Sequence, residues 1–255
     1  MSKMNRRSFL ESSAKVSAAA AVGTGVATGA SSAASIGAST LNANDKIHVA
    51  LVGCGGMGKG NLRDFLRLEE IECLAVSDVD EQRIEEGKGL VEEARGRKPD
   101  GYQDFRKIID RNDIDVVIIG TPDHWHALPT IMACESGKDV YVEKPLATSI
   151  AEGRAMVKAA RKYDRVVQVG TQQRSADHFA KAVEYVQSGK LGTIRQVRTW
   201  AFIDWKGAVG NPPDQAPPKG VDYDMWLGPA TKRPFNPARF HFTFRWFWDY
   251  SGGLM

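Results

Sequence analysis

Hydrophobic residues between positions 46 and 170 fall into short continuous runs that are separated by longer amphipathic stretches. The runs predict strands at residues 46–52, 71–77, 115–120, 139–143 and 166–170. The intervening stretches predict helices at residues 59–68, 125–136 and 150–163. Strands that alternate with helices of this length indicate an α/β fold with a doubly wound parallel sheet.

The pattern changes on both sides of this region. Residues 1–44 are rich in Ala, Gly, Ser and Thr, and they are too weakly apolar for a spanning helix of about 20 residues. Later in the chain, a long strand is predicted at residues 193–202 and a Pro-rich loop at 211–220. We therefore expect a leader and linker at 1–44, a first domain at 45–170 and an incomplete second domain at 171–255.

The composition is that of a globular protein. Of the 255 residues, 42% are hydrophobic and 9% aromatic, which excludes the fibrous, collagen-like and fully disordered classes. The formal net charge of +3 lies entirely in residues 1–44, since residues 45–255 carry 30 basic and 30 acidic side chains. Because this body has no basic excess and no basic stripe, nucleic acid is not an expected partner.

The leader has the form of an export signal. Arg6 and Arg7 precede a mildly apolar region without charge at residues 16–44. The pair resembles a twin-arginine signal, from whose commonest pattern Asn5 and Glu11 depart. Such a signal sends a folded protein to the periplasm, and the three cysteines, which form no even disulfide framework, agree with folding before export. The alternative is a disordered basic tail.

A glycine-rich turn follows the first predicted strand. Residues 53–58 read GCGGMG, and Asp78 stands at the end of the second strand, twenty residues after Gly58. The glycines allow tight backbone angles and let a pyrophosphate approach a helix N-terminus, while the acid accepts hydrogen bonds from a ribose. The alternative is a turn that serves only strand-helix packing. The expected cofactor-binding residues here are Gly53, Gly55, Gly56, Met57, Gly58 and Asp78.

Asp78 also bears on the identity of the dinucleotide. A carboxylate at this position accepts two ribose hydroxyls and repels a 2′-phosphate, which favours NAD over NADP. Ser77 and Arg83 lie close enough in sequence to assist a phosphate, so NADP remains possible.

Three further strand ends carry polar side chains, and ligands of such sheets bind beyond these ends. They are residues 121–126 (TPDHWH), 143–145 (EKP) and 171–174 (TQQR). Asp123, His124 and His126 form a thin ligand set without a neighbouring Cys or His pair, so we expect no metal site.

Taken in order, these motifs resemble those of a known family. The glycine turn, the T-P-x-x-x-H segment, the E-K-P triplet, the Q-Q-R strand end and a helix closing with SGKLG at residues 188–192 are similar to the Gfo/Idh/MocA oxidoreductases, over residues 46–255. The resemblance implies a Rossmann domain that binds NAD or NADP, followed by the start of an α/β open-sheet domain. It also implies a sugar or cyclitol substrate at their junction and a homo-oligomer of full-length chains.

The resemblance assigns roles to individual positions. The Lys144–Pro145 peptide bond is expected to be cis. Many relatives carry Asn or Arg at the position of Gln173, which leaves the substrate open. The implied cofactor-binding residues are Thr121, Pro122, His126, Glu143, Lys144 and Gln172, and the implied substrate-binding residues are Lys144, Gln173 and Arg174.

Lys144 is the candidate catalytic residue. An ammonium beside an oxidised nicotinamide feels a like charge, which lowers its pKa and suits it to hydrogen-bond or deprotonate a substrate hydroxyl as hydride leaves the adjacent carbon. The alternative is a solvated Lys144 that pairs with Glu143 in a turn.

Aromatic and polar side chains alternate over residues 239–248 (RFHFTFRWFW). This period of two predicts one aromatic face and one polar face. The aromatic face either stacks on sugar rings or belongs to the core or a subunit interface, and the second interpretation is favoured.

The chain closes soon after a Gly-Gly pair at residues 252–253. In the family, such a pair leads into an acid and a histidine that handle the proton, and we expect a C-terminally truncated fragment without them. The leading hypothesis is an exported NAD-dependent oxidoreductase that acts on a CH–OH group. One alternative is a glycoside hydrolase that oxidises its sugar transiently and eliminates the leaving group, and another is a non-catalytic sensor of nucleotide and sugar.

Overall fold

The computed structural model describes residues 46–200 and 209–253, and the predicted leader at 1–44 lies outside them. Its strands are β1 (Ile47–Val52), β2 (Ile71–Ser77), β3 (Asp100–Tyr102), β4 (Val116–Ile119), β5 (Asp139–Glu143) and β6 (Val167–Gly170). They form one sheet in the order β3-β2-β1-β4-β5-β6, and all neighbours are parallel. The predicted doubly wound parallel sheet is confirmed.

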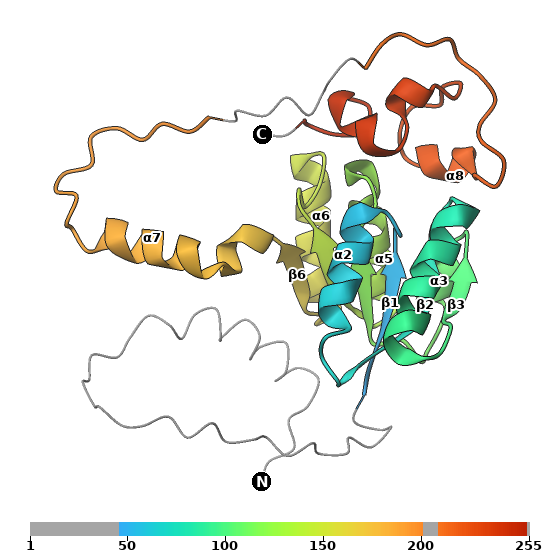
Figure 1. The fold of residues 1–255 in the computed structure, drawn as a ribbon, viewed down its shortest axis with the longest axis horizontal. Helices are drawn as coiled ribbons and strands as arrows, with labels where there is room; N and C mark the ends of the chain where they lie inside the picture. The colour runs from blue at the N-terminus through green and yellow to red at the C-terminus, as the bar shows by residue number, and fades with distance from the viewer. Residues whose placement is uncertain (1–45, 201–208, 254–255) are drawn as a thin grey trace.

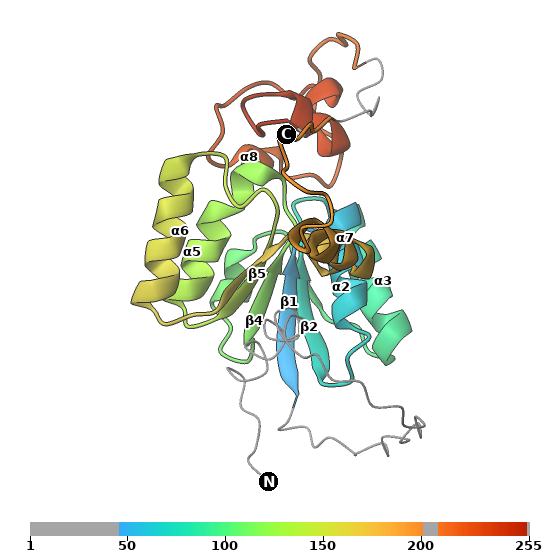
Figure 2. The same cartoon turned by 90° about the vertical axis from the view of Figure 1, so that its left-hand side faces the viewer.

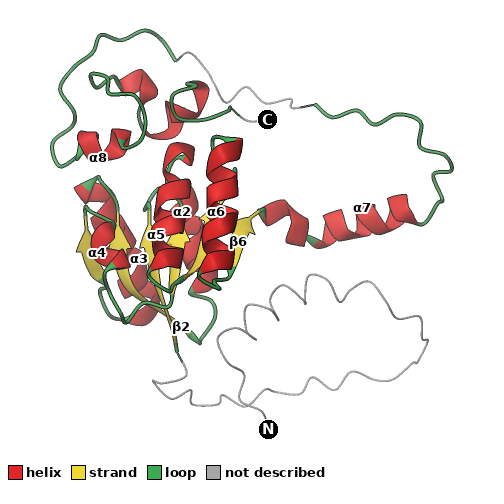
Figure 3. Ribbon diagram, turned by 180° about the vertical axis from the view of Figure 1, so that it is seen from behind, coloured by secondary structure: helices red, strands yellow, loops and turns green. Residues whose placement is uncertain are grey.

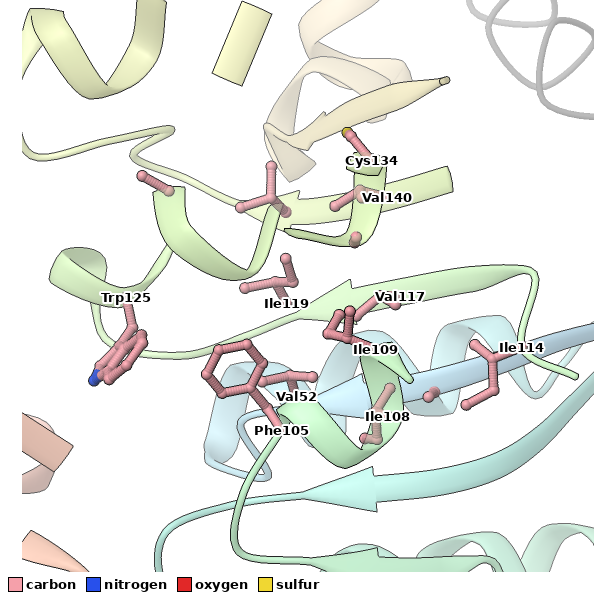
Figure 4. Packing of buried hydrophobic residues seen from close by; sticks show 14 of the residues in the cluster. Val52, Phe105, Ile108, Ile109, Ile114, Val117, Ile119, Trp125, Cys134 and Val140 are labelled. Carbon is pink, nitrogen blue, oxygen red and sulfur yellow. The ribbon is translucent and has the colours of Figure 1, made fainter. Parts of the chain in front are cut away.

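Helices cover both faces of this sheet (Figures 1 and 2). They are α2 (Gly56–Phe65), α3 (Glu81–Arg95), α4 (Arg106–Ile109), α5 (Ala127–Glu135) and α6 (Ile150–Lys162). Apolar side chains of α2 and α3 join one core cluster, and those of α4, α5 and α6 join the other. Figure 4 shows part of the second cluster, in which Phe105 and Trp125 meet edge to face beside Val52.

The central strands are apolar on both sides because both faces are covered. Along β1, Val49 and Leu51 belong to the cluster under α2 and α3, whereas Ala50 and Val52 belong to the opposite cluster. This alternation explains why the strands appear in the sequence as continuous apolar runs. The predicted strands at residues 71–77 and 139–143 agree with β2 and β5 at both ends.

The sequence prediction placed no element between residues 78 and 115, where the structure has α3, β3 and α4. Helix α3 buries only Ile84, Gly87 and Val91, so its apolar stripe is narrow. Its boundaries are nevertheless encoded locally. The Asp80 side chain accepts from the backbone N–H of Gln82, and Gly96 ends the helix with a left-handed φ of 71°.

Beyond β6, the chain forms a short 3₁₀ turn, η4 (Gln172–Ser175), and then α7 (Asp177–Gln187), which extends away from the sheet (Figure 1). None of the residues of α7 is buried. Residues 193–200 form no strand, so the strand predicted at 193–202 is wrong over these residues, and the last two positions lie outside the described part. None of the strand pairings of the described sheet includes this segment. Within the part of the chain described, no helix combines the length and apolar character needed to cross a bilayer.

The segment at residues 209–253 lies over the carboxyl ends of the strands (Figures 1 and 3). It contains α8 (Tyr223–Leu227) and two 3₁₀ turns, η5 (Pro237–Arg239) and η6 (His241–Trp246). This segment has its own cluster of buried hydrophobic side chains, all but one of them aromatic, which we call the aromatic cluster. Its members are Trp226, Leu227, Phe235, Phe240, Phe244 and Tyr250. Backbone hydrogen bonds tie the segment to the connection between β2 and α3, among them Asp222 N to Val79 O at 2.9 Å and Glu81 N to Gly220 O at 3.0 Å.

The alternating aromatic run does not produce one aromatic face. Because residues 241–246 form a 3₁₀ turn and not an extended strand, side chains two apart do not point to the same side. Phe240 and Phe244 enter the aromatic cluster, as the favoured core interpretation expected, whereas Phe242 is 54% exposed. The predicted single face is therefore wrong.

Candidate active site

A cavity of about 620 Å³ opens at the carboxyl ends of β1, β2, β4 and β5. Residues from both parts of the structure line it. Gly53, Asp78, Thr121 and Lys144 follow the four strands, and the segment over the strand ends adds His241, Phe242, Phe244 and Arg245. This is the edge at which the order of a doubly wound sheet reverses and where such sheets bind ligands.

The glycine turn at the head of α2 requires the absence of side chains. Gly53 has a φ of +92°, and a Cβ on Gly53 would lie 2.7 Å from the carbonyl carbon of Gly120. A Cβ on Gly58 would lie 1.9 Å from the carbonyl oxygen of Gly53. Three backbone segments therefore meet within van der Waals contact at Gly53, Gly58 and Gly120, which brings the start of α2 close to the sheet.

The same turn also faces the cavity. Gly53, Gly55, Gly56 and Met57 line it, whereas Gly58 is buried in the packing contact. The N-cap residue of α2, Gly55, offers no side-chain cap, and the first turn of the helix contains no acid. Such a helix end presents backbone N–H groups and a positive dipole to an anion. The glycine turn can therefore serve both strand-helix packing and anion binding, which the sequence analysis treated as alternatives.

Asp78 lies at the end of β2 with its carboxylate held by the backbone. One oxygen accepts from Cys54 N at 2.7 Å and the other from Asp80 N at 3.1 Å. Burial raises the pKa of Asp78 above its usual range, and the Arg83 guanidinium opposes this shift. Each oxygen keeps lone-pair capacity for a further hydroxyl donor, so Asp78 can accept hydrogen bonds from a ribose. Arg83 lines the cavity beside it.

The E-K-P turn places its two charged side chains in different surroundings. Glu143 is 4% exposed, and its carboxylate accepts from Asn61 Nδ2 at 3.0 Å and from the Lys144 backbone N at 3.1 Å. Among the described residues, the Lys144 ammonium has no ion pair with Glu143, and it lies exposed at the cavity wall. The structure therefore does not contain the paired arrangement considered as the alternative. The Lys144–Pro145 peptide bond is cis, as expected.

Asn61 is a site residue that sequence reasoning missed. It lies on α2, is 8% exposed and donates the amide hydrogen bond that fixes Glu143. The only signal was a polar residue at the third position after the last glycine of the turn, within a helical stretch.

The side chains of the two histidines after β4 contact backbone carbonyl oxygens. His124 lies within a short 3₁₀ turn, η3 (Asp123–Trp125), and His126 directly follows it. His126 was expected along the cofactor, but it is 1% exposed and does not line the cavity. Its ring nitrogens lie 2.6 Å from the Pro145 carbonyl oxygen and 2.9 Å from that of Thr121, so the ring joins the two loops from behind.

His124 contacts the segment over the strand ends. Its Nε2 lies 2.9 Å from the carbonyl oxygen of Trp226, and burial lowers the pKa of His124 to about 4. The neutral ring with Nε2 protonated can donate this hydrogen bond. In the described ranges, no group of three or more His, Cys, Asp or Glu residues is placed to hold a metal ion.

The polar positions after β6 are not part of the cavity. Gln172, Gln173 and Arg174 lie in η4, all three are exposed, and none lines the cavity. Because β6 is an edge strand, β4 and β5 lie between the strand before this turn and β1, which precedes the glycine turn. The structure thus brings together Gly53, Gly55, Gly56, Met57, Asp78, Thr121, Pro122, Glu143 and Lys144, and it leaves out Gly58, His126, Gln172, Gln173 and Arg174.

Comparison with known proteins agrees with this arrangement. A sequence model of the Gfo/Idh/MocA family, described as an oxidoreductase family with an NAD-binding Rossmann fold, matches residues 47–171. A second model, for the C-terminal α/β domain of such oxidoreductases, matches residues 182–255.

Individual relatives match parts of the chain. A levoglucosan dehydrogenase from Pseudarthrobacter phenanthrenivorans is 31% identical over 76% of this chain and 50% of that protein. A glycosyl hydrolase family 109 protein from Shewanella pealeana is 36% identical over 46% of this chain and 27% of that protein. The crystal structure of myo-inositol 2-dehydrogenase from Lactobacillus plantarum superposes with a TM-score of 0.53 at 25% identity, covering 58% of this chain and 43% of that one. The chain thus spans half or less of the length of these relatives.

Proposed function

This chain belongs to the Gfo/Idh/MocA family of oxidoreductases, and we propose that it transfers a hydride between a hydroxyl-bearing carbon of a sugar-like or cyclitol substrate and a nicotinamide cofactor. One observation carries the proposal. A single cavity is lined by the glycine turn and Asp78 as well as by Lys144, the one residue assigned to the reacting hydroxyl. The dehydrogenases among the matched proteins act, by their names, on levoglucosan and on myo-inositol.

Different parts of the cavity would bind different parts of the cofactor and the substrate. The start of α2 and the glycines before it would hold the pyrophosphate, and Asp78 would accept the hydroxyls of the adenosine ribose. A bound nicotinamide supplies the ring carbon that takes up or returns the hydride. Lys144 would orient the hydroxyl oxygen of the substrate, and in its uncharged form Nζ can take the hydroxyl proton as hydride leaves the same carbon.

Asp78 supports NAD as the cofactor. Its carboxylate oxygens already accept two backbone N–H groups and are fixed toward the cavity. A 2′-phosphate on the ribose would meet this negative charge, although Arg83 on the same wall would offset part of the repulsion.

Two measurements on the purified protein test the proposal. Denaturation should release a dinucleotide that mass spectrometry identifies as NAD or NADP. Incubation with NAD and a panel of sugars and cyclitols should then produce reduced nicotinamide with at least one substrate. Lys144→Ala should lower this rate by about 100-fold or more while NADH still binds. Lys158→Ala, on the exposed side of α6, is the matched control and should react like the wild type.

A second candidate is a redox-assisted glycoside hydrolase. It is favoured by the 36% identity to a glycosyl hydrolase family 109 protein over 122 residues. In such a reaction, oxidation to a ketone acidifies a neighbouring C–H bond, and elimination expels the leaving group of the glycosidic bond. Water then adds to the resulting double bond, and the hydride returns to the ketone. Net accumulation of NADH during turnover would exclude this candidate. Nucleotide binding without any reaction across the panel would instead indicate a sensor.

We also propose that residues 1–44 direct export of the folded protein to the periplasm through the twin-arginine machinery. The proposal rests on the Arg6-Arg7 pair before a mildly apolar stretch without charge. Replacing both arginines by lysine should leave the protein in the cytoplasmic fraction, whereas the wild type is recovered from the periplasm. Homo-oligomerisation is proposed from the family resemblance alone, and sedimentation velocity tests it.

A further inference from the structure

Asp123 is a buried acid to which the proposed reaction assigns no role. It is 8% exposed, belongs to η3 after β4, and lines the cavity. Its Oδ2 accepts from the Ser251 hydroxyl at 2.5 Å, and Ser251 is itself buried. Such a short distance is typical of a hydroxyl that donates to a charged carboxylate. The hydrogen bond joins the turn after β4 to the last part of the segment over the strand ends.

The same hydroxyl holds the backbone that follows it. Ser251 Oγ accepts from the Gly253 N–H at 3.2 Å, and Gly253, with a φ of +91°, lines the cavity. Two hydrogen bonds through one side chain therefore connect the Asp123 carboxylate to a piece of backbone in the cavity wall. Removing the Ser251 hydroxyl would break both of them at once.

The next two side chains of η3 contact a different part of the segment. His124 Nε2 lies 2.9 Å from the carbonyl oxygen of Trp226, and Trp125 Nε1 donates to the same oxygen at 3.0 Å. These two contacts hold α8, whereas the Asp123 contact reaches the stretch beside the Gly-Gly pair. A change at Ser251 leaves both contacts to Trp226 in place, so we expect α8 to stay docked.

The order of the strands places this connection on the reacting half of the cavity. Strand β4, which precedes Asp123, lies between β1 and β5. The glycine turn follows β1 and Lys144 follows β5, whereas Asp78 follows β2 on the far side of β1. Asp123 thus stands between the turn assigned to the pyrophosphate and the lysine assigned to the reacting hydroxyl.

We propose that Asp123 is a positioning residue for the sugar or cyclitol, and that it acts through Ser251 by holding the Gly253 backbone in the cavity wall. The inference rests on the proposed function, because it assumes that the reacting substrate occupies this half of the cavity. Asp123 needs no contact with the substrate for this role. A wall displaced by roughly 1 Å misaligns the reacting hydroxyl with Lys144, and such misplacements lower rates by up to about 100-fold.

The test measures NADH affinity and reaction kinetics on the same full-length variants. Fluorescence titration follows NADH, and NAD reduction is followed with a compound of the panel that the wild type oxidises, beginning with levoglucosan and myo-inositol. Ser251→Ala should bind NADH within about twofold of the wild type, while its kcat/KM for the sugar falls by about tenfold to 100-fold. Thr243→Val is the matched control. The Thr243 hydroxyl donates to the Phe240 carbonyl oxygen within the same segment, so this variant should behave like the wild type in both assays.

A double-mutant cycle shows whether Asp123 acts through Ser251. Asp123→Ala should lower kcat/KM about as much as Ser251→Ala does. In the Ser251→Ala background it should lower kcat/KM by no more than about twofold, since the connection is already broken. Asp123→Asn keeps an oxygen that can accept from Ser251 and should retain more activity than Asp123→Ala. A full effect of Asp123→Ala in both backgrounds would mean that Asp123 acts on the substrate directly, which overturns the inference.

The remaining failures are distinguishable. A kcat/KM of Ser251→Ala equal to that of the wild type overturns the inference and leaves the proposed function intact. An equal loss of NADH affinity and of kcat/KM overturns it as well, because the hydroxyl would then support the cavity as a whole. If the wild type binds NADH but oxidises no compound of the panel, the proposed hydride transfer fails together with the inference.

Discussion

Gly58 is the position at which the smallest change should have the largest effect. A Cβ added there would lie 1.9 Å from the carbonyl oxygen of Gly53 and 3.1 Å from its carbonyl carbon. Non-bonded contacts of this kind require about 3.0 Å or more, so the first turn of α2 must move by roughly 1 Å. Overpacking against a rigid backbone costs about 1–3 kcal/mol, of which alanine returns up to about 1 kcal/mol through its higher helix propensity.

The same displacement should weaken cofactor binding. A shift of roughly 1 Å at the start of α2 moves backbone N–H groups out of the range of about 2.7–3.2 Å that hydrogen bonds require. We therefore expect Gly58→Ala to unfold at lower urea concentration and to bind NADH about tenfold more weakly or worse. Urea denaturation and a fluorescence titration with NADH measure the two effects.

Gly60→Ala is the matched control. It lies on the same helix, and a Cβ at Gly60 meets no atom within 4 Å. This variant should be more stable than the wild type by up to about 1 kcal/mol and should bind NADH with unchanged affinity. If Gly58→Ala behaves like this control in both assays, the close approach of Gly58 to Gly53 does not position the glycine turn, and the reasoning is refuted.

Three further variants test other parts of the site. Asp78→Asn should improve the affinity for NADPH relative to NADH by about tenfold, because the charge that repels a 2′-phosphate is removed; equal ratios in variant and wild type would contradict the role of Asp78. For His124, the folded-state pKa of about 4 lies below the ordinary value of 6.5, so its stabilising effect is full above pH 6.5 and is lost as the pH falls toward 4. His124→Gln keeps a donor toward the Trp226 carbonyl but does not titrate. Between pH 7 and pH 4, the wild type should therefore lose about 3 kcal/mol more unfolding free energy than this variant loses. Asn61→Leu leaves the buried Glu143 carboxylate without a side-chain donor and should lower the free energy of unfolding, measured by urea denaturation, by about 2–3 kcal/mol. A decrease below about 0.5 kcal/mol would contradict a stabilising role of the Asn61–Glu143 hydrogen bond.

The part of the fold and site predicted from sequence is the part encoded locally. Strand β5 was predicted to the residue because a short apolar run ends abruptly at Glu143. The glycine turn, Asp78 and Lys144 lie at strand ends, and the carboxyl ends of parallel strands meet at one edge of the sheet. Their convergence on one cavity therefore follows from the topology alone.

The errors concern orientation and long-range contact. His126 has the expected spacing after β4, but η3 turns its ring toward the carbonyl oxygens of Thr121 and Pro145. Arg245 reaches the cavity only because the segment over the strand ends packs there through its own aromatic cluster. A local sequence pattern does not determine the direction of a side chain after a single turn. It also does not determine where a distant segment packs.

The central claim is hydride transfer at this cavity, and isotope transfer tests it most directly. The full-length protein would be incubated with NAD and with sugars or cyclitols that carry deuterium on the hydroxyl-bearing carbons, and the nucleotide would then be examined by mass spectrometry. We predict that at least one substrate places deuterium on the nicotinamide ring, and that Lys144→Ala lowers the labelling rate by about 100-fold or more. The account is contradicted if the nucleotide binds but stays unlabelled across the panel, or if Lys144→Ala labels as fast as the wild type.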